Sequence, residues 1–129
     1  MGNNRCRENK GVEPEVTRIN PNWEVSVSDV KAMLDSGASL LLLDVRQPEE
    51  HAIGRIDGAH LMPLPDLPNR IDEIRELAGD RQIVALCHHG GRSLNAAAIL
   101  RQGGLMQSKS MAGGIDAWSL EIDSSIARY

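Results

Sequence analysis

The sequence predicts an α/β domain whose mainly parallel β-sheet carries helices on both faces. Two apolar runs, at residues 40–44 and 82–86, are typical of strands buried on both faces of a parallel sheet. Helical patterns of apolar residues alternate with such runs, which favours this class. The chain of 129 residues suits one domain, expected over residues 15–129, behind a polar and charged tail at 1–14 that we expect to be disordered.

Before the first buried run, the sequence contains two short β-prone segments and one helix. The β-prone segments are residues 16–19 and 23–27, separated by an Asn-Pro-Asn turn sequence. Ser28 and the aspartate after it are typical of a helix start, and apolar residues then recur on one face until Gly37. A helix is therefore expected to lead into the first buried strand.

Between the two buried runs, proline and glycine divide the chain into short elements. Pro48 opens a short helix that ends at Gly54, and residues 60–62 form a short strand. Residues 63–68 contain three prolines, so we expect an extended connection there and no helix. Apolar residues at helical spacing then predict a helix over 71–78.

After the second buried run, the chain passes through a glycine-containing loop at 87–92 into an alanine-rich helix at 93–102. Residues 105–111 have a weak strand pattern. A Gly-Gly turn at 113–114 then precedes a short helix through residues 115–118.

Composition excludes several function classes. The chain has no Phe, two Trp and one Tyr, so its core must be built mainly from aliphatic residues and Met. This low aromatic content argues against the binding of single-stranded nucleic acids, whose bases stack on aromatic side chains. A net charge of -4 gives no attraction to nucleic-acid phosphates. The longest apolar run is too short to span a membrane, and no secretory signal is visible. The chain has two cysteines, Cys6 in the polar tail and Cys87 inside a motif, so we expect no disulfide framework and a location in the reducing cytoplasm.

The loop at residues 87–93 carries the chemistry. Cys87 follows a buried strand at its C-terminal end, where open α/β sheets place their ligands. Gly90 and Gly91 let successive backbone N–H groups converge, the next helix begins at Ser93, and Arg92 adds a positive charge. These features lower a thiol pKa and favour anions, which predicts a nucleophilic thiolate. A buried structural cysteine before an ordinary turn is the alternative.

The pattern Cys-x-x-Gly-x-Arg-Ser resembles the active-site loop of the rhodanese family. Three further segments are similar to signatures of that family, at residues 42–51, 54–63 and 113–118. The resemblance spans roughly residues 23–129. It implies a sheet of about five strands, thiosulfate or a persulfide as sulfur donor, and cyanide or a thiol as acceptor. The segment 123–129 is also similar to the tail of rhodanese domains fused to ubiquitin-like-protein activating enzymes.

By this resemblance, Cys87 is the nucleophile and persulfide carrier, and Asp44 and Arg46 brace the active loop, with a plain ion pair as the alternative. The substrate-binding residues are expected to be His88, His89, Gly90, Gly91, Arg92 and Ser93. Arg92 either orients anions or pairs structurally, and the two histidines contribute either side chains or only backbone N–H groups. No cofactor or metal is expected, because Cys87 and the two adjacent histidines lack the spacing of zinc ligands.

Three function classes remain open at this point. The first is a sulfurtransferase that takes sulfur from a small donor such as thiosulfate and gives it to a thiol or a sulfur-carrier protein. The second is a phosphatase or arsenate reductase, whose loop typically reads Cys-x₅-Arg and is one residue longer than the loop from Cys87 to Arg92. The third is a regulatory binding module without catalysis. Cys6 is either an incidental thiol or a resolving thiol.

Overall fold

The computed structural model describes residues 19–129. The expected disordered tail, the β-prone residues 16–18 and the role of Cys6 lie outside that part of the chain. The strands are β1 (Glu24–Val25), β2 (Leu40–Asp44), β3 (His60–Leu61), β4 (Gln82–Leu86) and β5 (Ser108–Met111). The helices are α1 (Val27–Asp35), α2 (Pro48–Ile53), the 3-10 helix η2 (Leu64–Asn69), α3 (Ile71–Ala78), α4 (Gly91–Gln102) and α5 (Gly114–Glu121).

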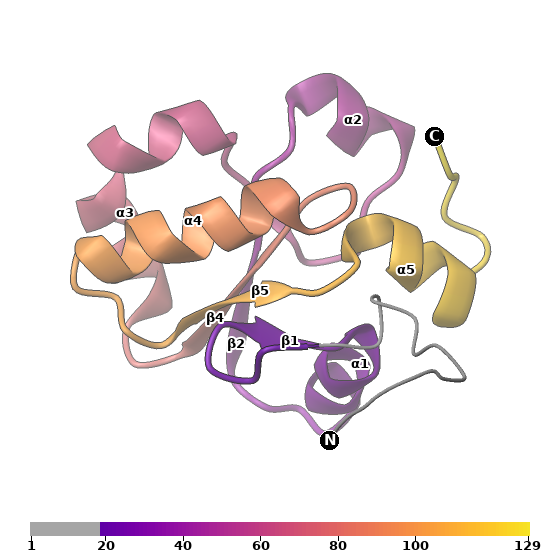
Figure 1. Ribbon diagram of the computed structural model, residues 1–129, viewed down its shortest axis with the longest axis horizontal. Helices are drawn as coiled ribbons and strands as arrows, with labels where there is room; N and C mark the ends of the chain where they lie inside the picture. The colour runs from indigo at the N-terminus through magenta and orange to yellow at the C-terminus, as the bar shows by residue number, and fades with distance from the viewer. Residues whose placement is uncertain (1–18) are drawn as a thin grey trace, which may run out of the picture.

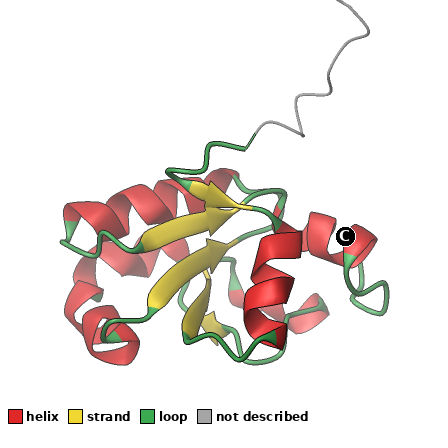
Figure 2. Ribbon diagram, turned by 90° about the horizontal axis from the view of Figure 1, so that it is seen from below, coloured by secondary structure: helices red, strands yellow, loops and turns green. Residues whose placement is uncertain are grey.

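The five strands form one sheet in the order β1-β5-β4-β2-β3, and every neighbouring pair is parallel. This confirms the expected five-stranded α/β architecture, with helices on both faces of the sheet (Figure 2). The central strand is β4, and its partner β2 ends beside it, with Asp44 opposite Leu86. The loops that follow β2 and β4 therefore start next to each other at the carboxyl edge of the sheet.

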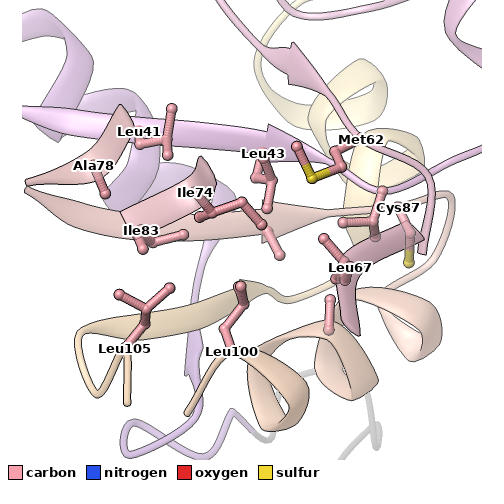
Figure 3. Close-up of a cluster of buried hydrophobic side chains, with 13 residues drawn as sticks. Leu41, Leu43, Met62, Leu67, Ile74, Ala78, Ile83, Cys87, Leu100 and Leu105 are labelled. Atoms are coloured by element: carbon pink, nitrogen blue, oxygen red, sulfur yellow. The ribbon is translucent and has the colours of Figure 1, made fainter. Parts of the chain in front are cut away.

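Two apolar clusters cover the two faces of the sheet, and alternate residues of β2 and β4 belong to each. Leu41 and Leu43 pack with α3, η2 and α4 on one face, whereas Leu42 packs with α1 and α5 on the other. Figure 3 shows the first cluster, with Cys87 at one end of it. Both buried runs are thus covered on both sides, as the sequence predicts, and Trp118 is the aromatic residue of this otherwise aliphatic core.

Three expectations about local structure were wrong. Residues 63–68 do not form an extended connection, because residues 64–69 form η2 and bury Leu67 in the core. Proline fixes φ near −65°, which suits the first turn of a helix as well as an extended chain. The first helix begins at Val27 and not at Ser28, and its N-cap is Ser26, whose hydroxyl accepts from the Asp29 amide over 3.0 Å. Helix α4 begins at Gly91 instead of Ser93.

The chain after α5 turns back along the molecule and runs toward α2 (Figure 1). The Ser119 hydroxyl donates to the carbonyl of Ile126 over 2.7 Å, and Arg128 forms an ion pair with Asp116 at 2.9 Å. The Ile126 side chain packs against the second apolar cluster. This C-terminal segment therefore ends beside the carboxyl edge of the sheet. Within residues 19–129, no helix has the length and apolar character needed to cross a membrane.

Candidate active site

Cys87 lies directly after the central strand β4, and its side chain is 1% exposed. Its Sγ accepts two backbone hydrogen bonds, from Gly90 N over 3.1 Å and from Ser93 N over 3.3 Å. Donors that point at one sulfur stabilise its thiolate more than its thiol, because the thiolate is the stronger acceptor. The convergence of amides that the sequence predicts is therefore present around a free thiol.

The hydroxyl of Ser93 completes the polar surroundings of the sulfur. It lies 3.4 Å from Cys87 Sγ, donates to the Gly90 carbonyl over 3.2 Å and lies 2.7 Å from the hydroxyl of Ser110 on β5. Because a hydroxyl rotates freely, Ser93 can accept from the thiol and donate to the thiolate. Ser93 is thus a contact of the reactive sulfur through its side chain as well as its amide.

Two glycine positions allow the loop to close this tightly. Gly90 has φ of 116°, in the left-handed region that favours glycine. Gly114, at the start of α5, has φ of 61°, and a Cβ there would lie 2.4 Å from the His88 carbonyl oxygen and 2.5 Å from that of Cys87. The backbone of the loop therefore packs against Gly114 of α5, a helix distant in sequence, and only glycine leaves room for this contact.

Asp44 and Arg46, which follow β2, form a fully buried ion pair beside the loop. Arg46 donates to Asp44 through Nε over 2.9 Å and through Nη2 over 2.7 Å, and both side chains are 0% exposed. The remaining Arg46 donors bind the carbonyls of Glu50 and Gly54 and the hydroxyl of Tyr129. Burial would raise the pKa of Asp44, but hydrogen bonds from Arg46 and His51 outweigh it and hold that pKa below its usual value.

Arg92 is engaged by a carboxylate that the sequence analysis did not single out. Its Nη1 and Nη2 donate to the two carboxylate oxygens of Glu50 on α2 over 2.6 and 2.8 Å. The Tyr129 hydroxyl donates to the same carboxylate over 2.9 Å. The hydrogen bonds from Arg92 lower the pKa of Glu50 to about 2, and the same contact raises the pKa of Arg92. The structure thus shows the structural pairing of Arg92, which was one of its two expected roles.

The two histidines of the loop differ in their surroundings. The His88 ring stacks on the Tyr129 ring at a centroid distance of 4.0 Å and on the His89 ring at 3.9 Å. Its Nε2 is buried and finds no hydrogen-bond partner among the described residues, and burial lowers the pKa of His88. His89 is exposed, with Nδ1 4.0 Å from Asp116. His88 therefore forms part of the wall of the site with its side chain, while His89 lies at its surface.

The structure brings all nine expected site residues to the carboxyl edge of the sheet, on the loops after β2 and β4 and the first turn of α4. Sequence reasoning missed Glu50, Tyr129 and Gly114. The capping pattern of α2, in which Glu50 accepts from the Gln47 amide, explains Glu50 locally and gives no sign of its partner 42 residues away. Over residues 19–129, His, Cys, Asp and Glu form no group of three that could hold a metal ion.

Comparison with known proteins gives the same family. Residues 26–121 match the family model of the rhodanese-like domain. A sulfurtransferase of Allochromatium vinosum is 35% identical over 96 residues, covering 74% of this chain and 87% of that protein. The probable adenylyltransferase/sulfurtransferase MoeZ of Mycobacterium tuberculosis is 35% identical over 105 residues, which is 81% of this chain and 26% of MoeZ. The chain thus spans about a quarter of the length of the first curated relatives that it matches.

Solved structures share the fold. The human single-domain sulfurtransferase TSTD1 superposes with a TM-score of 0.65 at 28% identity, covering 76% of this chain and 96% of that one. The protein SSP1007 of Staphylococcus saprophyticus gives 0.69 at 25% identity, covering 78% and 96%. A matched family model over most of the chain, a relative that it nearly spans and a shared five-stranded sheet agree. The chain belongs to the rhodanese-like domain family, to which sulfurtransferases similar to it also belong.

Proposed function

We propose that this protein is a sulfurtransferase that carries a sulfane sulfur as a persulfide on Cys87. The observation that carries the proposal is the pair of amides, from Gly90 and Ser93, that point at the Cys87 Sγ at the end of the central strand. Two amide donors that point at one sulfur atom stabilise its anionic form best. Nucleophilic catalysis of this kind splits the transfer into two exchange steps.

In the first step the Cys87 thiolate attacks the sulfane sulfur of the donor. The Sγ–S bond forms, and the bond between the sulfane sulfur and the rest of the donor breaks. With thiosulfate, the electron pair of that bond leaves on sulfite, so the charge of -3 on the reactants equals that on persulfide anion plus sulfite. No oxidant, reductant or proton is consumed.

In the second step an acceptor attacks the outer sulfur of the persulfide, and the thiolate of Cys87 leaves. Cyanide yields thiocyanate, and a thiolate yields a new persulfide. Because an S–S bond is about 2.05 Å long, the outer sulfur lies further from the buried Sγ and closer to the acceptor. The first amides of α4, at Gly91 and Arg92, have no carbonyl partner inside the helix, which makes them the donors proposed for that outer sulfur.

Donor and acceptor are proposed as classes. The donor is thiosulfate or a persulfide, and the acceptor is cyanide, a small thiol or a sulfur-carrier protein. The relatives named as sulfurtransferases support the reaction class, while the adenylyltransferase activity in the name of MoeZ is not part of the proposal. A reducing cytoplasm is the proposed setting, since the chemistry requires Cys87 to return to the thiolate after each cycle.

Intact-protein mass spectrometry tests the proposal. Incubation with thiosulfate should add one sulfur atom, about 32 Da, and cyanide should then remove it and release thiocyanate. Steady-state rates with varied donor and acceptor should follow ping-pong kinetics.

The two cysteines of the chain provide a matched control. Cys6→Ser should acquire the adduct at the wild-type rate, whereas Cys87→Ser should not acquire it. An adduct that persists in Cys87→Ser, or wild-type protein that never acquires one, would refute the assignment. Retention of the fold in Cys87→Ser is checked by circular dichroism.

A further inference from the structure

The positive charge at the rim of the active loop is already neutralised. Arg92 binds Glu50 through two parallel hydrogen bonds of 2.6 and 2.8 Å, the geometry in which a guanidinium and a carboxylate interact most strongly. Glu50 is 19% exposed and Arg92 36% exposed, so the pair is partly shielded from water. The sequence predicts a cationic loop, and the folded protein offers an ion pair with no net charge instead.

The Glu50 carboxylate is held in this position from several directions. One of its oxygens accepts from the Gln47 amide over 3.0 Å, and the other accepts from the Tyr129 hydroxyl over 2.9 Å. The Tyr129 oxygen in turn accepts from Arg46, which the buried Asp44 fixes. Glu50 therefore cannot swing away from Arg92 without breaking hydrogen bonds that reach back to the buried ion pair.

Other charged groups described around the loop are compensated as well. Arg46 is paired with Asp44, and Arg128 with Asp116. His88 is stacked and partly buried, which disfavours its protonation. An anionic donor that approaches Cys87 consequently meets amide dipoles and no uncompensated arginine among these groups. A second negative charge on the donor therefore adds little to the attraction between the donor and this site.

We propose that Glu50 is a specificity-determining residue that, by neutralising Arg92, selects sulfur donors with one negative charge or none over dianionic donors. The inference rests on the proposed function, since it concerns the donor that loads Cys87. Tyr129 is a positioning residue in this arrangement because it acts on the donor only through Glu50. Loss of the Glu50 charge exposes the charge of Arg92 to the donor.

Two tetrahedral donors that differ in charge measure this selection directly. Thiosulfate is a dianion, and methanethiosulfonate is a monoanion in which a methyl group replaces one charged oxygen. Each gives its sulfane sulfur to the Cys87 thiolate, and the electron pair of the broken S–S bond leaves on sulfite or methanesulfinate. Coulomb energy scales with charge, so a gain of about threefold for the monoanion corresponds to about tenfold for the dianion at low salt.

The experiment compares the rates at which the two donors load Cys87, followed by intact mass in wild type and in Glu50→Gln. An amide oxygen at residue 50 can still accept from the Gln47 amide, which preserves the start of α2. We expect the ratio of thiosulfate to methanethiosulfonate rates to rise about threefold in Glu50→Gln. The thiosulfate rate of this variant should also fall more steeply with added salt than that of wild type.

Glu49→Gln is the matched control, since it removes the same charge from the same helix at an exposed position. Its donor ratio should stay at the wild-type value. An equal rise in Glu49→Gln would attribute the effect to net charge and overturn the inference. A flat ratio in Glu50→Gln with both donors loading Cys87 would also overturn it and leave the proposed function intact.

Tyr129→Phe provides a second route that does not depend on how Glu50→Gln folds. It keeps the ring beside His88 and removes the hydroxyl that holds Glu50, so the donor ratio should rise by a smaller factor in the same direction. A ratio unchanged in Tyr129→Phe and in Glu50→Gln contradicts the inference. Failure of both donors to load wild-type Cys87 instead contradicts the proposed function itself.

Discussion

The amide of Ile115 donates to the carbonyl oxygen of Cys87 over 2.8 Å. The next amide, that of Asp116, donates to the His88 carbonyl over 3.1 Å, so the first turn of α5 binds the peptide units of the active loop. The carbonyls of Cys87 and His88 are thereby held toward α5, at the start of the loop whose Gly90 and Ser93 amides donate to the Cys87 sulfur. Helix α5 thus holds the backbone of the active loop through the amides of its first turn.

Gly114→Ala should therefore disrupt the active loop. The new Cβ would overlap the Cys87 and His88 carbonyl oxygens at 2.5 and 2.4 Å, so we expect a loss of stability of about 3 kcal/mol or more and a loss of sulfur loading. Gly37 has a similar φ of 74° but an open surrounding, so Gly37→Ala should cost only about 1 kcal/mol and leave loading unchanged. Urea unfolding and intact mass measure both. Equal costs for the two variants would contradict the contact argument.

Ser93→Ala should make the Cys87 thiolate less stable while keeping both amide donors to its sulfur. The variant loses a hydroxyl 3.4 Å from Cys87 Sγ, and one hydrogen bond contributes about 1 kcal/mol, so sulfur loading should slow roughly fivefold. The rate at which iodoacetamide alkylates Cys87 at neutral pH should fall by a similar factor. Ser108→Ala is the control, because the Ser108 hydroxyl is buried without a partner among the described residues and its removal should be neutral or stabilising. An unchanged alkylation rate in Ser93→Ala would show that the backbone amides alone stabilise the Cys87 thiolate.

Asp44→Asn should be among the most destabilising conservative substitutions. It leaves the Arg46 charge buried at 0% exposure without its partner, which costs about 3–5 kcal/mol. Asp35→Asn breaks an exposed ion pair with Lys31 and should cost less than about 0.5 kcal/mol. Denaturant midpoints at pH 7 compare the two. A small loss for Asp44→Asn would mean that water reaches Arg46.

The Glu50–Arg92 pair should give stability that depends on pH. The folded pKa of Glu50, about 2, lies below the unfolded value of 4.5, so the pair stabilises fully above pH 4.5 and its contribution is lost as pH falls toward 2. The pair is partly exposed, so Glu50→Gln should lower the stability at pH 7 by about 1 kcal/mol. The difference in melting temperature between wild type and this variant should shrink below pH 4.5. A difference that is constant between pH 7 and pH 3 would contradict the pKa.

Aryl phosphates should not be hydrolysed. Four residues separate Cys87 from Arg92, and the loop cannot widen easily, since a Cβ on Gly90 would already lie 3.3 Å from the Gly113 amide nitrogen. Donors must lie about 3 Å from developing charge, and amides already close on Sγ leave no room for a three-oxygen group. A chromogenic phosphate assay with wild type and Cys87→Ser checks this. Turnover that disappears in Cys87→Ser would favour the phosphatase class.

Local patterns predicted the elements of this fold well, because a strand that is buried on both faces is apolar at nearly every position. Residues 40–44 and 82–86 are apolar without alternation, and both lie inside the sheet. The prediction for the proline-rich residues 63–68 was wrong because the fixed φ of proline suits both an extended segment and a 3-10 helix. Only the burial of Leu67 in the core decides between the two.

The site was predictable where one segment contains all of its parts. Cys87, both loop glycines and Ser93 lie in seven consecutive residues, so their convergence could be read from spacing. The contacts of Glu50 with Arg92 and with Tyr129 join residues 42 and 79 positions apart, and no local pattern encodes such a distance. The sequence therefore allows two roles for Arg92, and only the contacts of the folded chain distinguish them.

The pairing of β1 with β5 has a consequence for how the protein is made. Glu24 pairs with Ser110, so the first described strand has no neighbour in the sheet until nearly the whole domain has left the ribosome. Helix α5, which binds the Cys87 and His88 carbonyls, emerges later still. At about 5–20 residues per second, the nascent chain carries Cys87 for seconds without its scaffold. Until α5 docks, the active loop lacks the hydrogen bonds to its Cys87 and His88 carbonyls, so the ordered surroundings of the Cys87 sulfur are completed late in the folding of the domain.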